Sequence, residues 1–545
     1  MAVVAPVEVV EAASIVTTMP SRAVDPVCGS ACLLLAALAL TACGGSTSGQ
    51  PFAADSGFTP ETAGPGGDSG ASDVVSMDAT PEAEAGCASV VCDGVCVQAA
   101  SCAFSVTSVS PTGGPMNGAN FITLKGHGFA AGMQVHLGDG RAVVRVLDPA
   151  TALIQPPPGP HQVVDVTVAL ASNTAVLPQS YRYESGSLGN TWEKKPLSTP
   201  RGVYPGLSLL QDGRMLISGG AANAAEVPVT SAEIYDPTTG VASLVGSSMS
   251  VARFEHAAVT LMTGKVLLAG NWGTPTAVAD LFDPTSNTFA PSASMLTTAR
   301  AATIGVLLVD GRVLLMSNAT PSAEIYDPVA DQFSAVAGAP VLTDDYDLPW
   351  PVRLRDGRVL VVKGSGRPCY FFDSDTDTFT MAGAGPQTVF IWNSPLENGV
   401  HVLPDGRVAV IGGNQAPIFT PISTIELFDP ATSTAFAPAP YTLTAPREAP
   451  GTALLRDGTV IVIGGVTAPS PQARSCNTTF SVTSAVDVID PVGAAVSSFA
   501  ALPDPNWTLG VATLLDGSLV AAGGTTCGGA VSYPYMYFMQ GTALQ

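Results

Sequence analysis

The last two thirds of the chain repeat one pattern of hydrophobic and polar positions. A short apolar segment ends in Asp-Gly or Thr-Gly and leads into a second apolar run that ends in glycine, as in LLQDGRMLISGG (209–220) and VLPDGRVAVIGG (402–413). Further on in each repeat, an apolar segment ends in Asp-Pro, as in SAEIYDPTTG (231–240). Asp-Gly supplies the positive φ angles of a tight hairpin, and Asp-Pro favours a turn. The pattern therefore predicts four antiparallel strands in each repeat.

The repeat occurs seven times. The turn glycines of the seven copies are Gly213, Gly264, Gly311, Gly357, Gly406, Gly458 and Gly517. Their mean step of about 51 residues is close to the length of a four-stranded propeller blade. The seventh copy ends after its third strand at 535–545, whereas the segment at 190–197 resembles a fourth strand without a repeat of its own. We therefore expect 190–197 to close a ring of seven blades over residues 185–545, which would leave only short sheet edges.

This pattern resembles the bacterial kelch family, close to the type of seven-bladed propeller found in galactose oxidase. The double glycine of the family follows the second strand in four repeats, at 219–220, 412–413, 464–465 and 523–524. The usual Trp of the fourth strand is often Phe here, at Phe289, Phe333, Phe379 and Phe436. The resemblance covers about 350 residues and implies an all-β, seven-bladed kelch-type propeller.

A second β region precedes the repeats. Residues 104–184 alternate apolar and polar positions between turns rich in Gly and Pro, as in MQVHLGDG (133–140) and VVDVTVAL (163–170). This period of two predicts a small β-sandwich. The segment VTSVSPTGGPMNGANFITLKGHGF (106–129) and the closing SYRYE (180–184) resemble the IPT/TIG family of immunoglobulin-like domains.

Residues 1–42 have the features of a signal peptide. The apolar run ACLLLAALALTAC (31–43) is too short to span a bilayer. Its last four residues, LTAC, resemble the lipobox of bacterial lipoproteins, in which the cysteine, here Cys43, becomes the lipid-modified first residue. By resemblance to Gram-negative lipoproteins with Gly after this cysteine, we expect a lipid-anchored protein at the outer membrane or cell surface. An ordinary secretory signal, and hence a secreted protein, is the alternative.

Residues 43–86 are rich in Gly, Ser, Pro and acidic residues, which predicts a disordered tether. The short segment 87–103 then holds four cysteines, namely Cys87, Cys92, Cys96 and Cys102. An even set of cysteines in an exported chain favours disulfides. A zinc site is the alternative, but the spacing lacks paired C-x2-C units. Cys476 and Cys527 fall in neighbouring loops of the last two repeats, so we expect a disulfide between them.

The charge balance excludes one class of partner. The chain has 22 Lys and Arg against 44 Asp and Glu, which gives a formal net charge of -22. With so few basic residues no basic patch can form, so we expect no nucleic-acid partner.

Candidate binding residues gather at one end of the predicted propeller. Successive turns of an antiparallel meander alternate between its two ends, so the Asp-Gly and Asp-Pro turns share one end, and the variable loops and the links between repeats share the other. Variable loops on a rigid scaffold usually carry function. The candidates at this second end are Arg201, Arg253, Trp272, Arg300, Trp350, Trp392, Arg447 and Trp507. Such side chains can bind a sugar or a protein; the alternative is that the arginines hold the repeats together and the tryptophans cap the core.

The resemblance to galactose and glyoxal oxidases raises an enzymatic alternative. Their copper site needs two histidines, two tyrosines and a cysteine cross-linked to one tyrosine. The repeat region contains only His256 and His401, without a Tyr-His pair, and the sequence ends without the extra domain that completes that site. We therefore assign no catalytic residue, metal or cofactor and expect a non-catalytic surface protein that binds a carbohydrate or a protein. A structural or adhesion spacer is the further alternative.

Overall fold

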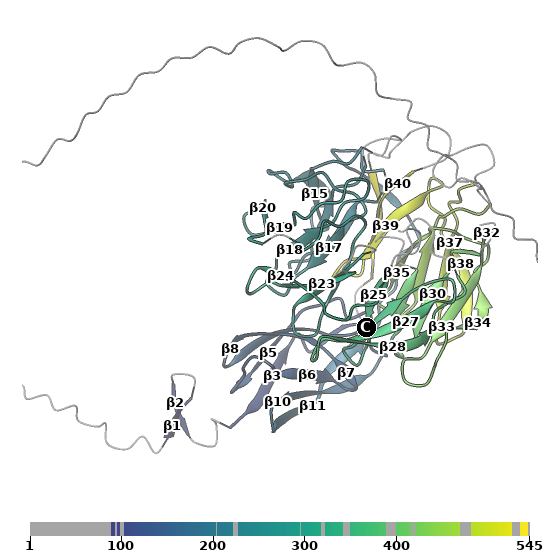
Figure 1. Ribbon diagram of the computed structural model, residues 1–545. Helices are drawn as coiled ribbons and strands as arrows, with labels where there is room; N and C mark the ends of the chain where they lie inside the picture. The colour runs from purple at the N-terminus through teal and green to yellow at the C-terminus, as the bar shows by residue number, and fades with distance from the viewer. Residues whose placement is uncertain are drawn as a thin grey trace, which may run out of the picture. The chain divides into compact units, whose positions relative to one another are not determined.

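The computed structural model describes part of the chain. The described residues are 103–542, with gaps at 203, 222–226, 295, 318–321, 342–348, 389–398, 416–419, 469–480 and 526–534, and the backbone of 89–92 and 95–98. Contacts divide the chain into two units, Met1–Pro81 and Glu82–Gln545, and the first lies outside the described residues. The described elements are all strands (Figure 1), so the all-β class is confirmed for this part of the chain. No helix within these ranges is long and apolar enough to cross a membrane.

The cysteine-rich segment contains a short hairpin. Strands β1 (Ser89–Cys92) and β2 (Val95–Gln98) pair antiparallel, with Val91 opposite Cys96. The disulfides predicted among Cys87, Cys92, Cys96 and Cys102 depend on side chains outside the described part of the chain.

Residues 105–184 form a β-sandwich, called here the first domain. One sheet has the order β3 (Ser105–Ser110), β5 (Ile122–His127), β9 (Thr151–Gln155) and β8 (Val143–Asp148). The other has the order β4 (Gly113–Pro115), β11 (Asn173–Glu184), β10 (Val163–Leu170), β6 (Gln134–Leu137) and β7 (Gly140–Arg141). Alternate residues of both sheets, such as Leu124 and Val166, are fully buried between them. The alternation in the sequence therefore corresponds to an inner and an outer face.

The repeats form seven four-stranded antiparallel sheets among the described residues, called here the seven-sheet region. Sheet 1 is β13 (Gly206–Leu209), β14 (Met215–Ser218), β15 (Ala232–Asp236) and β16 (Val241–Leu244). Sheet 2 is β17 (Ala257–Thr260), β18 (Val266–Ala269), β19 (Asp280–Asp283) and β20 (Thr288–Pro291). Sheet 3 is β21 (Ile304–Leu307), β22 (Val313–Met316), β23 (Ala323–Asp327) and β24 (Gln332–Ala335). Sheet 4 is β25 (Trp350–Arg353), β26 (Val359–Val362), β27 (Pro368–Asp373) and β28 (Thr378–Ala384). Sheet 5 is β29 (Val400–Val402), β30 (Val408–Ile411), β33 (Thr424–Phe428) and β34 (Ala437–Thr442). Sheet 6 is β35 (Gly451–Leu454), β36 (Val460–Ile463), β37 (Val486–Asp490) and β38 (Ala495–Phe499). Sheet 7 is β39 (Trp507–Thr513), β40 (Leu519–Thr525), β41 (Tyr535–Met539) and β12 (Glu193–Pro196). A small separate hairpin of β31 (Asn414–Gln415) and β32 (Thr420–Pro421) lies between the second and third strands of sheet 5 in the chain.

Hydrophobic packing between neighbouring sheets explains the apolar runs of the repeats. The second strands of sheets 1 to 6 are buried at all four positions, because each sheet packs on both faces. Between sheets 1 and 2, for example, Leu216 and Ile234 pack with Leu268 and Phe282. Each such side chain contributes about 1.5–3 kcal/mol on burial. The fourth strands of sheets 1 to 3 are largely exposed.

The N-terminal strand of the seven-sheet region completes its last sheet. Strand β12 pairs antiparallel with β41, with Glu193 opposite Phe538 and Pro196 opposite Tyr535, which agrees with the pairing expected from the sequence. The indole Nε1 of Trp192 donates to the carbonyl oxygen of Ala500 at 2.7 Å. First strands of neighbouring sheets contact one another in sheets 1 to 5 and in sheets 6 and 7, and β39 of sheet 7 contacts β13 of sheet 1. The first and last repeats are therefore joined through both strand pairing and packing.

Candidate functional site

The seven-sheet region has two different ends. The turn end carries the turns within each sheet, such as 308–312 and 374–377. The loop end carries the links between sheets and the loops between second and third strands, such as 197–205 and 270–279. A ligand could bind at either end or along the axis between them.

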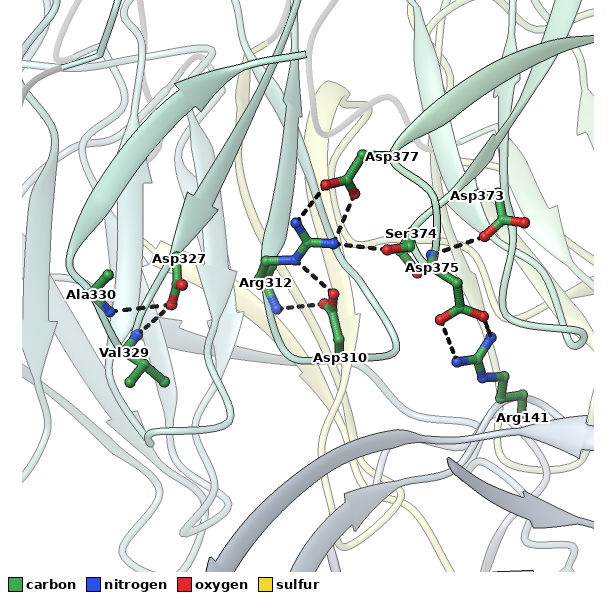
Figure 2. A network of polar contacts seen from close by, with 10 residues as sticks. All are labelled: Arg141, Asp310, Arg312, Asp327, Val329, Ala330, Asp373, Ser374, Asp375 and Asp377. Carbon is green, nitrogen blue, oxygen red and sulfur yellow. Dashed lines mark hydrogen bonds and ion pairs between the residues drawn. The ribbon is translucent and has the colours of Figure 1, made fainter. Parts of the chain in front are cut away.

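At the turn end, an ion pair from an Asp-Gly-Arg turn joins two neighbouring sheets. In sheet 3, Gly311 has a φ of 86°, and the carboxylate of Asp310 accepts hydrogen bonds from the backbone N–H and the Nε of Arg312. The Arg312 guanidinium reaches sheet 4, where it donates to Asp377 at 2.8 and 2.9 Å and to the carbonyl oxygen of Ser374 (Figure 2). The hydrogen bonds with Asp377 raise the pKa of Arg312.

The first domain docks on this turn end. Arg141 of β7 donates two hydrogen bonds of 2.7 Å to the carboxylate of Asp375, in a turn of sheet 4 (Figure 2). These hydrogen bonds lower the pKa of Asp375. Arg355 of the preceding turn forms an ion pair with Asp139, and its carbonyl oxygen accepts a 2.6 Å hydrogen bond from the N–H of Arg141. Bidentate Arg–carboxylate pairs fix orientation as well as distance.

Backbone and apolar contacts extend this interface over further sheets. The N–H of Val144 donates to the carbonyl oxygen of Val309 in sheet 3 at 2.9 Å, and the N–H of Met116 donates to that of Arg456 in sheet 6 at 3.1 Å. Val143 is fully buried in a hydrophobic cluster that includes residues of sheets 2 and 3. The interface therefore combines charge, backbone hydrogen bonds and apolar burial.

The four candidate arginines of the loop end are not exposed to a ligand. Each is fully buried and forms an ion pair with an acidic residue of a third strand, in the pairs Arg201–Glu233, Arg253–Asp280, Arg300–Glu324 and Arg447–Asp487. Burial lowers the pKa of three of these arginines, Arg201, Arg253 and Arg447. Their assignment to an exposed binding surface is therefore corrected. They have a structural role, as in the alternative interpretation, but each ion pair ties a link to its own sheet and does not join two repeats.

The candidate tryptophans are also largely internal. Trp350 and Trp507 begin the first strands of sheets 4 and 7 and are 3% and 9% exposed. Trp272 is half-buried and packs against the cluster of Tyr204, Ala221 and Phe254, so it keeps some exposed surface at the loop end. Trp392, Cys476 and Cys527 lie outside the described residues.

The links of the loop end hold two buried ionisable groups that the sequence analysis did not single out as binding residues. Burial lowers the pKa of His256 to about 3, and its Nε2 lies 2.9 Å from the hydroxyl of Ser218. Burial raises the pKa of Glu448 to about 7. Positive φ angles at Glu255 (50°) and Ala449 (49°) accompany these links. The loop end therefore combines buried polar groups with an uncommon backbone conformation.

A cavity of about 440 Å³ lies among the first strands. Six of the seven sheets contribute to its wall, and Asn117, Phe121 and Gln155 of the first domain line it as well. His401 of β29 faces this cavity, and its Nε2 lies 2.8 Å from the hydroxyl of Thr452. The first domain thus forms one wall of this cavity, which no motif in the sequence indicated.

The donor groups needed for a copper site do not come together within the described ranges. No group of three or more His, Cys, Asp or Glu side chains there is arranged to hold a metal ion. His256 and His401 each contact a hydroxyl of their own surroundings, Ser218 and Thr452 respectively. Cys369 is buried in β27, where its sulfur accepts a hydrogen bond from the N–H of Lys363. These residues do not fit the two-histidine, two-tyrosine copper site of the galactose-oxidase type.

Comparisons with known proteins agree with the two-part architecture. Residues 105–183 match the IPT/TIG domain family, which confirms the immunoglobulin-like fold of the first domain. No curated protein matches the chain. Among solved structures, the chain is similar to a novel fungal alcohol oxidase with catalytic diversity among the AA5 family, in complex with copper. The TM-score is 0.50 at 18% identity, over 65% of this chain and 76% of the oxidase. At this identity the similarity shows a shared fold of the galactose-oxidase type and does not extend to activity.

Proposed function

We propose that the chain is a non-catalytic, lipid-anchored protein of the bacterial cell surface whose seven sheets form a closed kelch-type β-propeller. The loop end of this propeller binds a carbohydrate or protein ligand. The turn end is already covered in part by the first domain, through the pairs Arg141–Asp375 and Arg355–Asp139. This docking is the main support for the proposal. The first domain covers part of the turn end, whereas the variable loops at the other end remain available to a partner.

The described loop of sheet 2 gives this proposal a specific starting point. Trp272 is half-buried against Phe254 and the neighbouring apolar residues, while Gly273 and Thr274 beside it are exposed. A tryptophan held in place by packing offers contact area at a low entropic cost, and aromatic anchors of this kind often dominate binding energy. The binding surface proposed for the loop end therefore rests on Trp272 as its aromatic anchor, and not on the arginines that the sequence suggests as binding residues.

The anchor and the tether belong to the same proposal. Lipidation at Cys43 would attach the chain to the membrane, and residues 43–86 have the composition of a flexible linker. Such a linker would hold the folded unit away from the lipid surface and leave its loop end free to meet a ligand.

The copper-oxidase alternative rests on fold similarity alone. His256 and His401 each lie within hydrogen-bond distance of a hydroxyl group, and no metal-binding group of side chains is formed in the described part of the chain. The copper content of the purified chain after loading and dialysis separates the two functions. One tightly held copper ion per chain, together with alcohol-dependent oxygen consumption, would favour the enzyme.

The binding proposal is tested with a glycan array and a pull-down from an extracellular extract, both using the full chain. Two variants place the same change at opposite ends of sheet 2: Thr274→Arg in the exposed loop and Thr285→Arg in the exposed turn. We expect Thr274→Arg and Trp272→Ala to weaken binding about tenfold or more, as for residues at the centre of an interface. Thr285→Arg is expected to bind like the wild type. Equal loss in both arginine variants, or no ligand in either screen, would contradict the proposal.

A further inference from the structure

The axial cavity has a wall that is polar but carries no acidic or strongly basic side chain. Among the described residues that line its 440 Å³, the polar ones are Asn117, Gln155, Ser208, Thr260, His401, Thr452 and Thr513. Asp, Glu, Lys and Arg do not occur among these lining residues. A charged group that loses part of its hydration on entering this cavity finds no partner of opposite charge in the wall, which is costly. The cavity is therefore suited to an uncharged occupant.

The hydroxyl groups of the wall are oriented by hydrogen bonds within the protein. Ser208 donates to the carbonyl oxygen of Ala258 at 3.2 Å, and Thr260 donates to that of Leu209 at 2.7 Å. Thr513 likewise donates to a backbone carbonyl oxygen of the neighbouring sheet 6, at 3.3 Å. A hydroxyl has one proton and two lone pairs, so each of these groups has used its donor and keeps acceptor capacity. The wall therefore favours an occupant that donates hydrogen bonds.

The first domain supplies the part of the wall at the turn end. Asn117 donates to the carbonyl oxygen of Leu454 at 3.1 Å and accepts from the N–H of Ala119, which fixes this loop against sheet 6. Phe121 of the same loop lines the cavity and offers an aromatic side chain on which the C–H groups of a sugar or polyol ring can pack. The volume falls within the range of small-molecule sites, about 300–1,000 Å³.

We propose that the axial cavity is a binding site for a small uncharged polyhydroxy compound, a monosaccharide or a cyclic polyol. Its hydroxyl protons would meet the acceptors of Ser208, Thr260 and Thr513, and its ring would pack on Phe121. The proposal goes beyond the proposed function, because it adds a site on the axis that is separate from the binding surface at the loop end. It also gives the IPT/TIG domain a role in ligand binding, as the element that completes the site.

The test is isothermal titration calorimetry of the full chain with D-glucose, D-mannose and myo-inositol as probes. D-glucuronate serves as a probe of similar size that carries a carboxylate. We expect at least one neutral probe to bind with one site per chain, and D-glucuronate to bind at least about tenfold more weakly, since its charge has no counter-ion in the cavity.

Two cavity variants and one control connect the binding to this site. Thr452→Val removes a lining hydroxyl without changing the shape of the side chain, and we expect about a tenfold loss of affinity. Ala119→Trp fills the cavity from the loop of the first domain and is expected to abolish binding, while Thr174→Val, at an exposed position of β11, leaves it unchanged. The far-ultraviolet circular dichroism of all three must match the wild type.

Three results would overturn the cavity proposal. They are the absence of binding by every neutral probe up to millimolar concentration, equal affinity for D-glucuronate, and unchanged binding in Ala119→Trp. If the glycan array or the pull-down is positive with the wild-type chain while no neutral probe binds it in the calorimetry, the cavity proposal is wrong and binding at the loop end stands. A crystal structure of the soaked protein that shows only ordered water in the cavity would have the same consequence.

Discussion

The buried pair of Arg201 and Glu233 allows a quantitative test of how the links are held to their sheets. Both side chains are fully buried, and the Arg201 Nε lies 3.2 Å from the Glu233 carboxylate. Arg201 also donates to the carbonyl oxygens of Gly219 and Ser231 at 2.8 and 2.7 Å. The substitution Arg201→Met keeps a long apolar side chain but leaves the Glu233 carboxylate without its counter-ion.

The expected cost follows from these surroundings. Removal of one partner from a buried ion pair costs about 3–5 kcal/mol, because the other charge remains buried. Glu233 would still accept hydrogen bonds from the N–H groups of Ser198 at 2.7 Å and Thr199 at 3.0 Å. This remaining compensation places the expected loss at the lower end of the range, at about 3 kcal/mol. The matched control is Arg214→Met, whose pair with Asp212 is 30% and 46% exposed and is expected to contribute less than about 1 kcal/mol.

The assay is unfolding of the full chain in guanidinium chloride, followed by tryptophan fluorescence and by far-ultraviolet circular dichroism. A free energy is derived only if the two probes give coincident transitions, and the slope m must stay constant between variants. A shift of less than about 1 kcal/mol in Arg201→Met, or a shift equal to that of Arg214→Met, would refute the assignment of a structural role to this arginine.

Four further predictions follow from the sequence and the structure. Labelled palmitate should enter the wild-type chain and not Cys43→Ala, and equal labelling of both would exclude the lipid anchor at this position. Deletion of 185–200, which includes β12, should lower the thermal stability of the entire seven-sheet region, because sheet 7 would lose its edge strand. A melting curve like that of the intact chain would contradict ring closure. Peptide mapping without reduction should recover a peptide that links Cys476 to Cys527, and free alkylation of both thiols in the folded protein would exclude the bridge. The pKa of Glu448, about 7 in the folded chain, lies above its unfolded value, so the folded chain should lose stability as the pH rises from about 4.5 to 7. Glu448→Gln should therefore be more stable than the wild type at pH 8. An equal dependence of stability on pH in both proteins would contradict this.

The repeat could be predicted from the sequence because its signals are local. The Asp-Gly turn and the adjoining apolar run determine a hairpin within a dozen residues, and the structure places β14 (Met215–Ser218) and its equivalents where the apolar runs lie. The pairing of β12 with β41 could also be predicted, since one strand was missing at the C-terminal end and one was left over at the start of the repeats.

The arginines of the links were harder to place because their partners are distant in the sequence. Arg253 pairs with Asp280, and Arg201 pairs with Glu233, 27 and 32 residues away. Charged residues are mostly exposed, so the sequence alone predicts an exposed position for an arginine in a link. One signal could have corrected this interpretation: an acidic residue recurs within the otherwise apolar third strand, as Glu233 in SAEIYDP and Asp280 in VADLFDP.

The docking of the first domain and the axial cavity could not be predicted from the sequence at all. Asp139 and Arg141 stand in the segment GDGR, which looks like an ordinary polar turn. Their role depends on Arg355 and Asp375, more than 200 residues later. Only the three-dimensional arrangement brings these turns together, and with them the loop of Asn117 that lines the cavity.

Hydrogen–deuterium exchange of the full chain, with and without a ligand from the glycan array or the pull-down, tests most directly whether the loop end is the binding surface. The account predicts that a macromolecular ligand protects peptides of the links and loops, above all 270–279, and leaves the turns at 284–287 and 490–494 unchanged. Protection confined to those turns, or to the exposed faces of the first domain, would contradict it.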